Sequence, residues 1–321
     1  MNFVFDQATF ASDAQQQLAF LVPQLYRINT EIEQNLYPEY NYADFMFVDT
    51  TGTVYDAGSV FYSGDIAGKA EFLSGAGFDM PFADISRSQF LQANHLAGIG
   101  YEYSWQELGR AAQLGQNLTT DKADAARRVA ESFIYGIAIR GSSEKNFGGF
   151  INDSNVPTAN VTADGTGSSP LWANKTGDQI LRDLNSALNA PRTATAYTYI
   201  ANTLVLPESA MDYLSSTPRT STSDATLLAY FRENNSYTQR TGQPLRILGS
   251  RELETAGTGS TRRLVAYANL PGVVRFHLPG GGHQFLPVHQ KGWGTWETPG
   301  VMNVGGTEIR RPSAMVYRDG F

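Results

Sequence analysis

The clearest periodic pattern in the chain lies between Thr120 and Arg140. Apolar residues recur there at three- and four-residue steps, which predicts a helix with one apolar face. Thr119, Thr120 and Asp121 offer side-chain oxygens to its first turn, and Gly141 is placed to end it. At a rise of 1.5 Å per residue, this helix is about 30 Å long. The predicted apolar face consists of Ala126, Val129, Ala130, Phe133, Ile134, Ile137 and Ala138.

Gly136 interrupts the good helix formers of this segment. A glycine in a helix interior costs about 1 kcal/mol relative to alanine. We therefore expect that another backbone approaches the helix closely at Gly136.

Residues 45–82 have a different pattern, in which short runs typical of strands alternate with glycines. The strand-like residues are Phe45, Phe47, Val54, Tyr55, Val60, Phe61 and Tyr62, and the glycines are Gly52, Gly58, Gly64, Gly68, Gly75 and Gly77. The pattern predicts a long hairpin with little core of its own. A two-stranded ribbon alone is marginally stable in water, so the hairpin is either a loose surface element or is laid over another surface.

The remaining segments follow in order along the chain. Residues 1–36 hold one amphipathic segment, Ala14–Gln24, which Pro23 interrupts, and this predicts an extended arm. Residues 82–103 alternate as strands do, and Trp105–Gln113 is predicted as a short helix with Leu108, Ala111 and Ala112 on one side. Residues 273–321 are predicted as strands and turns.

Alternating helices and strands between residues 146 and 272 predict a compact α/β unit. The helices are expected at Asp178–Leu188, Pro207–Tyr213 and Ser223–Asn234, and the strands at Tyr199–Leu206, Leu245–Leu248 and Arg263–Asn269. The long helix is predicted to pack against the strands before it and those after residue 273.

Charge is distributed unevenly. Residues 1–86 contain twelve acidic and two basic residues, a net charge of −10, and residues 87–321 contain nineteen acidic and twenty-two basic residues, a net charge of +3. The two parts are therefore predicted to form complementary surfaces, within one subunit or between neighbours. The overall charge of −7 argues against a protein that grips nucleic acid by neutralising phosphates. Only 17% of the residues are charged, which is low and fits a surface partly covered by partners.

Motifs that would indicate catalysis or cofactor binding are absent. The chain has no cysteine, no phosphate-binding G-x-x-x-x-G-K-[ST] loop and no G-x-S-x-G elbow. His277, His283 and His289 lie six residues apart, but Pro279, the glycines and Pro287 would break a strand that joins them, so no metal site is predicted. No cofactor and no catalytic residue is predicted, and neither a secretory signal nor a membrane-spanning segment is recognised.

Three ordered stretches resemble the major capsid proteins of tailed bacteriophages with the Hong Kong 97-type fold, in a branch catalogued as a phage capsid family of unknown function. The first runs from LYPEY at residues 36–40 through GKAEF at 68–72 to DMP at 79–81. The second is IGYEYSWQEL at 99–108, with Ala111, Ala112, Gly115 and the helix that follows. The third contains LVAY at 264–267, GGTEI at 305–309, Pro312 and YRDG at 317–320.

The resemblance implies an α+β fold with four parts. These are an N-terminal arm at residues 1–44, an extended E-loop at 45–82, a peripheral domain at 83–145 and 273–321 built on the spine helix 120–140, and an axial domain at 146–272. Nothing before Tyr37 resembles the long scaffolding segment of some relatives, so scaffolding is expected as a separate protein or not at all. Lys69 is the sole lysine before residue 122; one relative uses an E-loop lysine for a covalent cross-link, but Lys69 is interpreted as an ordinary surface charge.

The resemblance further implies a structural, non-enzymatic protein of the virion. It would assemble in the host bacterial cytoplasm into hexamers and pentamers that close into an icosahedral shell around double-stranded DNA, which it contacts without sequence specificity. Further partners would be scaffolding, portal and decoration proteins, with no membrane. Candidate intersubunit contacts are Tyr55, Phe61, Tyr62, Lys69, Glu71, Phe72, Arg127 and Arg128.

Other functions are compatible with parts of the sequence. A shell of the same fold around a protein cargo, as in encapsulin-like nanocompartments, is the nearest alternative. A soluble α/β hydrolase would need a preformed pocket with perturbed ionisable groups, for which the sequence gives no indication. A tail or adhesion protein fits poorly with the long central helix.

Overall fold

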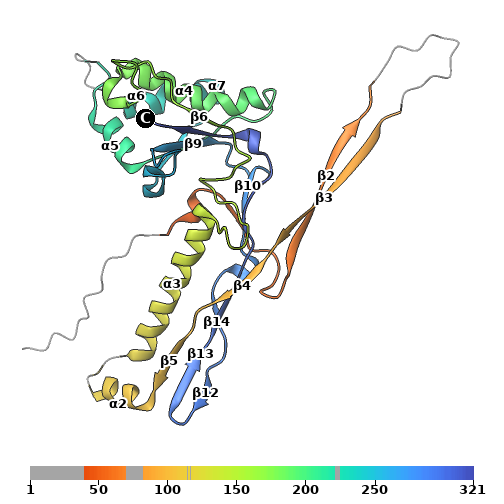
Figure 1. The fold of residues 1–321 in the computed structure, drawn as a ribbon, viewed down its shortest axis with the longest axis vertical. Helices are drawn as coiled ribbons and strands as arrows, with labels where there is room; N and C mark the ends of the chain where they lie inside the picture. The colour runs from red at the N-terminus through yellow and green to blue at the C-terminus, as the bar shows by residue number, and fades with distance from the viewer. Residues whose placement is uncertain (1–39, 70–81, 114, 116, 221–224) are drawn as a thin grey trace, which may run out of the picture.

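The structure is a computed structural model that describes residues 40–69, 82–113, 115, 117–220 and 225–321. The predicted arm segment Ala14–Gln24 lies outside these residues. Figure 1 shows an α/β unit at one end, a long helix flanked by strands below it, and a two-stranded hairpin that projects away from the body.

The long helix is α3, Leu118–Arg140, which confirms the predicted element with two more residues at its start. Its N-cap is Asn117, whose side chain makes no capping bond to the helix, so the predicted caps Thr119, Thr120 and Asp121 lie inside the helix. Gly141 ends it with a φ of 72° and an N–H bond of 2.9 Å to the Ile137 carbonyl. A side chain there would clash, because a Cβ at Gly141 would lie 2.3 Å from the Phe147 carbonyl oxygen.

The predicted apolar face of α3 is only partly buried. Ala126, Ala130, Ile134, Ile137 and Ala138 are buried, as predicted. Val129 and Phe133, however, are 53% and 46% exposed, so their predicted core positions are wrong. The seven residues cover a wider arc of the helix than the strands behind it cover, and these two lie at the edge of that arc.

Strands from distant parts of the chain surround α3. β4 (His95–Gly98) pairs with β14 (Gly300–Val304), and β5 (Tyr101–Ser104) pairs with β13 (Thr295–Thr298). α3 contacts β5 and also β15 (Gly306–Ile309). The predicted packing of the helix between early strands and strands after residue 273 is therefore confirmed.

Short strands complete the three small sheets of this part. β1 (Phe47–Asp49) runs parallel to β10 (Val274–His277), which pairs on its other side with β15. β11 (Gln284–Phe285) pairs with β14, and β12 (His289–Gly292) pairs with β13. The short helix α2 spans Trp105–Gln113, as predicted, but of its predicted inner side Leu108, Ala111 and Ala112 only Ala111 is buried.

The α/β unit is built on a five-stranded sheet with the order β6-β16-β9-β7-β8. These strands are β6 (Thr158–Asn160), β7 (Thr203–Leu206), β8 (Arg246–Gly249), β9 (Arg263–Tyr267) and β16 (Met315–Asp319). β16 lies between β6 and β9, so the prediction that all of residues 273–321 lie beside the long helix is wrong for this strand. Its apolar residues Met315, Val316 and Tyr317 are buried in this sheet.

Helices cover the sheet of the α/β unit (Figure 1). They are α4 (Gly177–Ala194), α5 (Glu208–Ser216), α6 (Leu227–Glu233) and α7 (Ser236–Thr241). α4 begins with a capping box in which Thr176 accepts from the Gln179 amide and the Gln179 side chain accepts from the Thr176 amide. Short 3-10 turns occur at η1 (Tyr42–Asp44), η2 (Trp172–Asn174), η3 (Arg251–Glu254), η4 (Pro279–Gly281) and η5 (Pro312–Ala314).

Two apolar clusters form the core. The first cluster joins α3 to the small sheets that pack against it and to one face of the five-stranded sheet. The second lies between the opposite face of that sheet and helices α4 to α6. Tyr267 and Tyr317 are fully buried between the parts, where their hydroxyls donate to the carbonyls of Phe45 and Phe150.

The projecting hairpin pairs β2 (Gly58–Ala67) with β3 (Asp84–Ala93) along their whole length. This corrects the predicted hairpin range of 45–82 at both ends. The second strand lies after residue 82, and the segment before Gly58 belongs to the body, because Phe45 and Met46 are buried in the core and β1 is paired there.

Candidate intersubunit contact surfaces

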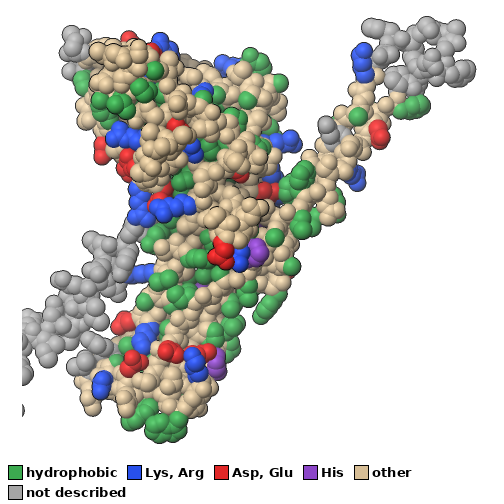
Figure 2. All heavy atoms as spheres, in the orientation of Figure 1, with side chains coloured by type: hydrophobic (Ala, Val, Ile, Leu, Met, Phe, Trp, Pro, Cys, Tyr) green, Lys and Arg blue, Asp and Glu red, His purple; other side chains and the backbone are tan. Residues whose placement is uncertain are grey.

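The β2–β3 hairpin has one apolar face that nothing in the described part of the chain covers. Successive side chains of a strand point to opposite faces, and the register places Val60 opposite Leu91 and Ile66 opposite Ile85. Together with Tyr62 these residues form what we call the apolar ribbon face. Their exposed fractions run from 48% for Val60 to 78% for Ile66. Figure 2 shows hydrophobic side chains along the projecting hairpin.

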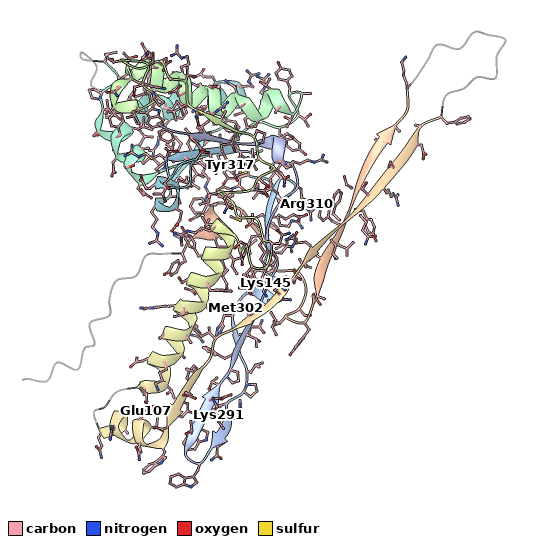
Figure 3. All side chains as sticks on the ribbon, in the orientation of Figure 1. Glu107, Lys145, Lys291, Met302, Arg310 and Tyr317 are labelled. Carbon is pink, nitrogen blue, oxygen red and sulfur yellow. The ribbon has the colours of Figure 1, made fainter. Side chains whose placement is uncertain are left out.

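The opposite face of the hairpin is polar except at its base. Ser59, Ser63, Ser86 and Ser88 lie on it by register. Near the base, Phe61 stacks on Phe90 with ring centroids 5.1 Å apart. The guanidinium carbon of Arg310 lies 4.3 Å from the Phe61 ring centroid, so this pair is held against the body. Figure 3 shows Arg310 beside the hairpin base.

Amide side chains fix the hairpin base to the body. Gln92 donates from Nε2 to the Gly305 carbonyl at 2.6 Å. Asn303 donates from Nδ2 to the Asp56 carbonyl at 2.8 Å, and Asn94 donates to the same oxygen at 3.3 Å. These bonds fix where the hairpin leaves the body, and Arg310 adds a contact to the Phe61–Phe90 pair just beyond them.

A charged cluster lies behind the base. Arg275 pairs with Asp49 at 2.7 Å, His277 Nε2 lies 2.7 Å from Glu308 Oε2, and Arg310 Nε donates to the same oxygen at 3.0 Å. Burial alone would raise the pKa of Glu308, but the His277 hydrogen bond and Arg310 outweigh it and hold that pKa below its ordinary value. The pKa of Asp49 is also lowered, by hydrogen bonds from Thr51 and Arg275 that outweigh burial. The cluster therefore favours ionised carboxylates that join β1, β10 and β15.

The two candidate arginines lie on α3, away from the hairpin. Arg127 pairs with Asp124 at 3.6 Å, and its guanidinium carbon lies 5.4 Å from the Phe285 ring centroid. Arg128 is exposed. Both side chains are exposed, Arg127 beside the strands that pack on the helix, so both can be reached by another molecule.

The other candidates occupy separate places. Tyr55 is 87% exposed in the turn before β2, and Lys69 is exposed beyond its end. Tyr62 belongs to the apolar ribbon face, and Phe61 packs against Phe90 and Arg310 instead. Glu71 and Phe72 lie outside the described residues. The structure thus divides the candidates between the hairpin, its flanks and α3, and does not gather them into one site.

Several exposed apolar residues are not among the contact candidates predicted from the sequence. On the hairpin these are Val60, Ile66, Ile85 and Leu91, and the alternation of β2 could have identified them if the second strand had been placed at Asp84–Ala93. At the far end of the body, Trp293 is 89% exposed and packs edge-on against Trp105 at 6.3 Å. Near them Lys291 pairs with Glu297 at 2.9 Å and Lys122 pairs with Glu107 at 3.0 Å. Lys291 and Glu107 mark this end in Figure 3.

The histidines do not converge. His277 is buried on β10, His283 contacts the Ile99 carbonyl at 2.9 Å, and His289 pairs with Glu297 at 3.1 Å. Within the described ranges, no group of three or more His, Cys, Asp or Glu side chains could hold a metal ion. Among the helices of those ranges, none combines the length and the apolar character that crossing a membrane requires.

Comparisons with known proteins agree with this architecture. The sequence profile of a family described as major capsid protein matches residues 68–321. A comparison with curated proteins finds no match.

Three solved structures show the same fold. The capsid of the Myoviridae phage XM1 is 15% identical, with a TM-score of 0.76 over 94% of this chain and 98% of that one. The capsid of a native GTA particle is 13% identical, with a TM-score of 0.61 over 92% and 95%. Mycobacterium phage Ogopogo gives 11% identity and a TM-score of 0.55 over 99% of each chain.

The arrangement of helices and sheets is the α+β fold of phage capsid subunits. Because the profile covers more than half of the chain, the protein belongs to the major capsid protein family. The resemblance seen in the sequence is thereby confirmed. Family membership makes the chain a structural rather than an enzymatic protein, located in the virion.

Proposed function

We propose that the chain assembles in the host bacterial cytoplasm into hexamers and pentamers, which close into an icosahedral shell around double-stranded phage DNA. Repeated heterologous contacts with rotational closure generate rings of this kind. Each subunit would contact several neighbours through different surfaces, and such multivalency makes a shell stable even when each contact is weak.

The parts of the subunit are assigned to the Hong Kong 97-type scheme. Residues 1–44 form the N-terminal arm, 45–82 belong to the E-loop, 83–145 and 273–321 to the peripheral domain with α3 as its spine, and 146–272 to the axial domain. We adjust this division in three places. The E-loop ribbon begins at Gly58 and continues through β3 to Ala93. The segment before Gly58 belongs to the body, and β16 belongs to the sheet of the α/β unit. In this scheme the ribbon reaches beyond its own subunit, and the α/β unit surrounds the axis of a capsomer.

One observation carries the proposal: no described part of the subunit covers the apolar ribbon face. An isolated two-stranded ribbon is marginal in water, and a contiguous exposed apolar surface usually marks an interaction site. Five apolar side chains on one face of β2 and β3 are at least 48% exposed. A neighbouring copy that covers them supplies the core that the ribbon lacks.

The packaged DNA would lie inside the shell without sequence-specific contacts, since a container with a net charge of −7 need not neutralise phosphates. Scaffolding, portal and decoration proteins are the expected further partners. A compartment for protein cargo is distinguished by its contents, because particles purified from an infection should contain nuclease-protected DNA.

The proposal is tested with two single substitutions on opposite faces of the ribbon. Tyr62→Asp places a charge on the apolar ribbon face, and Ser88→Asp places the same charge on the polar face. By negative-stain electron microscopy and sedimentation, wild type and Ser88→Asp should form rings or shells, and Tyr62→Asp should remain a folded subunit. A wild-type chain that stays monomeric at high concentration, or a Tyr62→Asp variant that forms normal shells, would contradict the proposal.

A shortened hairpin tests the same contact without adding a charge. Replacing residues 62–89 by Asn-Gly joins Phe61 to Phe90 through a two-residue turn and keeps the stacked pair and Arg310 in place. The body should retain its circular dichroism spectrum while shells disappear. Shells that persist would show that the ribbon is not needed for assembly.

A further inference from the structure

Lys175 is the one lysine of the described residues whose side chain is buried. It stands directly before Thr176, the N-cap of α4, and its side chain is 0% exposed. An ammonium group taken out of water must be paired and hydrogen-bonded, or it loses its proton. The groups around the Lys175 nitrogen therefore decide which chemistry this buried amine can undergo.

Two carboxyl groups reach the Lys175 Nζ. Asp183, on the buried side of α4, places its Oδ2 2.5 Å from this nitrogen, and its side chain is only 5% exposed. Asp164, in the loop that follows β6, places its Oδ1 at 3.2 Å and forms an ion pair with Arg182. The Thr162 carbonyl accepts from the same nitrogen at 2.6 Å. A potential nucleophile is thus held between two carboxyl groups in a buried position.

The two carboxyl groups have different surroundings. Asp183 lies beside Trp172, which packs on Phe321 in the apolar cluster under α4. Burial raises the pKa of Asp183 above its ordinary value, although the hydrogen bond from Lys175 acts in the opposite direction. Burial of both partners favours a neutral carboxylic acid beside a neutral amine, and a desolvated lysine amine is a nucleophile. Asp164 is more exposed and lies against the Arg182 cation, which favours its ionised form.

We infer that Lys175 and Asp183 join within the folded subunit through an amide bond between Nζ of the lysine and Cγ of the aspartate, with Asp164 as the proton carrier. The three side chains form a modification site inside the α/β unit. The inference goes beyond the proposed function and does not depend on it, because every reacting group belongs to one chain.

The reaction is a condensation that needs no oxidant and no further reactant. A proton passes from the Lys175 ammonium to the Asp183 carboxylate, which leaves an amine and a carboxylic acid. The amine lone pair forms the N–C bond at Cγ, and Asp164 accepts the proton that the nitrogen then releases. Asp164 returns this proton to the departing hydroxyl, the C–O bond breaks, and one water leaves. The product is a neutral amide in place of two buried charges, whose desolvation is costly.

The mass of the denatured, full-length chain tests the inference. The wild-type chain should be lighter than its sequence by the mass of one water. Lys175→Met removes the nucleophile and should have the full mass of its sequence. Lys145→Arg is the matched control, because Lys145 also pairs with a carboxylate, Glu144 at 3.1 Å, but in an exposed position. This variant should lose one water as the wild type does.

Tryptic peptides locate the bond. Trypsin does not cleave after an acylated lysine, so residues 146–182 should remain one peptide and should be linked to residues 183–192. A bond from Lys175 to Asp164 would instead lie within the first peptide, and this result would overturn the assignment of Asp183. The peptides come from the wild-type chain, so this measurement holds even if Lys175→Met does not fold.

Asp164→Asn tests the proton carrier. A group that transfers protons in the transition state contributes about 10²–10⁴-fold to a rate, so the lighter species should accumulate at least about a hundredfold more slowly after refolding from urea. Accumulation at the wild-type rate would overturn the role of Asp164. A wild-type chain with the full mass of its sequence, or a Lys175→Met chain that also lacks one water, would overturn the bond itself.

Discussion

The guanidinium carbon of Arg310 lies 4.3 Å from the ring centroid of Phe61, and this contact joins the body to the base of the hairpin. Arg310 is itself held by Glu308, whose Oε2 accepts its Nε–H at 3.0 Å. The body therefore contacts the hairpin on the hairpin face that is otherwise polar. The apolar ribbon face, which points the other way, is left free for a neighbour.

Removing the contact between Arg310 and Phe61 should make the hydrogen bonds at the hairpin base open more often, without unfolding the body. A cation–π contact contributes about 0.5–1 kcal/mol, so Arg310→Ala should speed amide hydrogen exchange in the base of β2 and β3 by roughly two- to fivefold. Arg87→Ala is the control, because Arg87 lies on the apolar ribbon side of the same hairpin, opposite Gly64. Equal exchange in the two variants would show that Arg310 does not restrain the hairpin.

Breaking the buried pair between Arg263 and Asp319 should lower the free energy of unfolding far more than breaking an exposed pair. Two bonds of 2.7 Å join these side chains, which are 8% and 1% exposed. Asp319→Ala leaves a buried, unpaired cation and should lower the free energy of unfolding by about 3–5 kcal/mol. Asp44→Ala, which breaks the exposed pair with Arg246, should cost less than about 1 kcal/mol. Urea unfolding below the assembly concentration measures both, and similar losses would contradict the argument.

Acid should destabilise the subunit through three carboxyl groups. The pKa values of Asp49, Glu308 and Asp319 are lowered, because hydrogen bonds and nearby cations outweigh the burial that would raise them. Their stabilisation is complete above the ordinary carboxyl pKa of about 4 and is lost as pH falls through the lower folded values. Burial raises the pKa of Asp183, so protonation of this group at low pH favours the folded state. It is one group against the three that favour unfolding in acid.

Thermal unfolding from pH 6 to pH 3 tests this expectation. The melting temperature should fall most steeply below about pH 4. Glu308→Gln should start lower and fall less steeply, because its amide cannot titrate. A wild-type melting temperature that stays level to pH 3 would show that the three carboxyl groups are not linked to folding.

The elements with strong local signals could be predicted from the sequence. α2 and α3 follow from apolar periodicity and from a C-terminal glycine whose φ of 72° suits no other residue well. The position of β16 could not be predicted, because its pairing with β6 and β9 depends on contacts about 160 and 50 residues away and not on local pattern. Periodicity also misplaced Val129 and Phe133, since it identifies an apolar stripe but not how much of it the subunit itself covers.

The contact surfaces were predicted less well than the fold. Tyr62 was identified because it lies in a conspicuous strand-like run, but the rest of the apolar ribbon face depends on the register between β2 and β3. Gly136 is predicted to lie under another backbone, and only the three-dimensional surroundings show that a Cβ there would meet nothing within 4 Å in the described subunit. The coreless ribbon and the low charged fraction indicate that some surface is covered, but they do not say which residues cover it.

Salt should separate electrostatic from apolar contributions to assembly. Residues 1–86 carry −10 and the remainder +3, and contacts between such surfaces on neighbouring subunits are screened as ionic strength rises. The Debye length falls from about 10 Å at 0.1 M to about 3 Å at 1 M. Apolar contacts are not screened in this way, and strongly hydrated salts strengthen them. The protein concentration at which light scattering begins should therefore rise with sodium chloride. A threshold that does not change with salt would place the charge complementarity within the subunit and leave the apolar ribbon face as the main source of assembly.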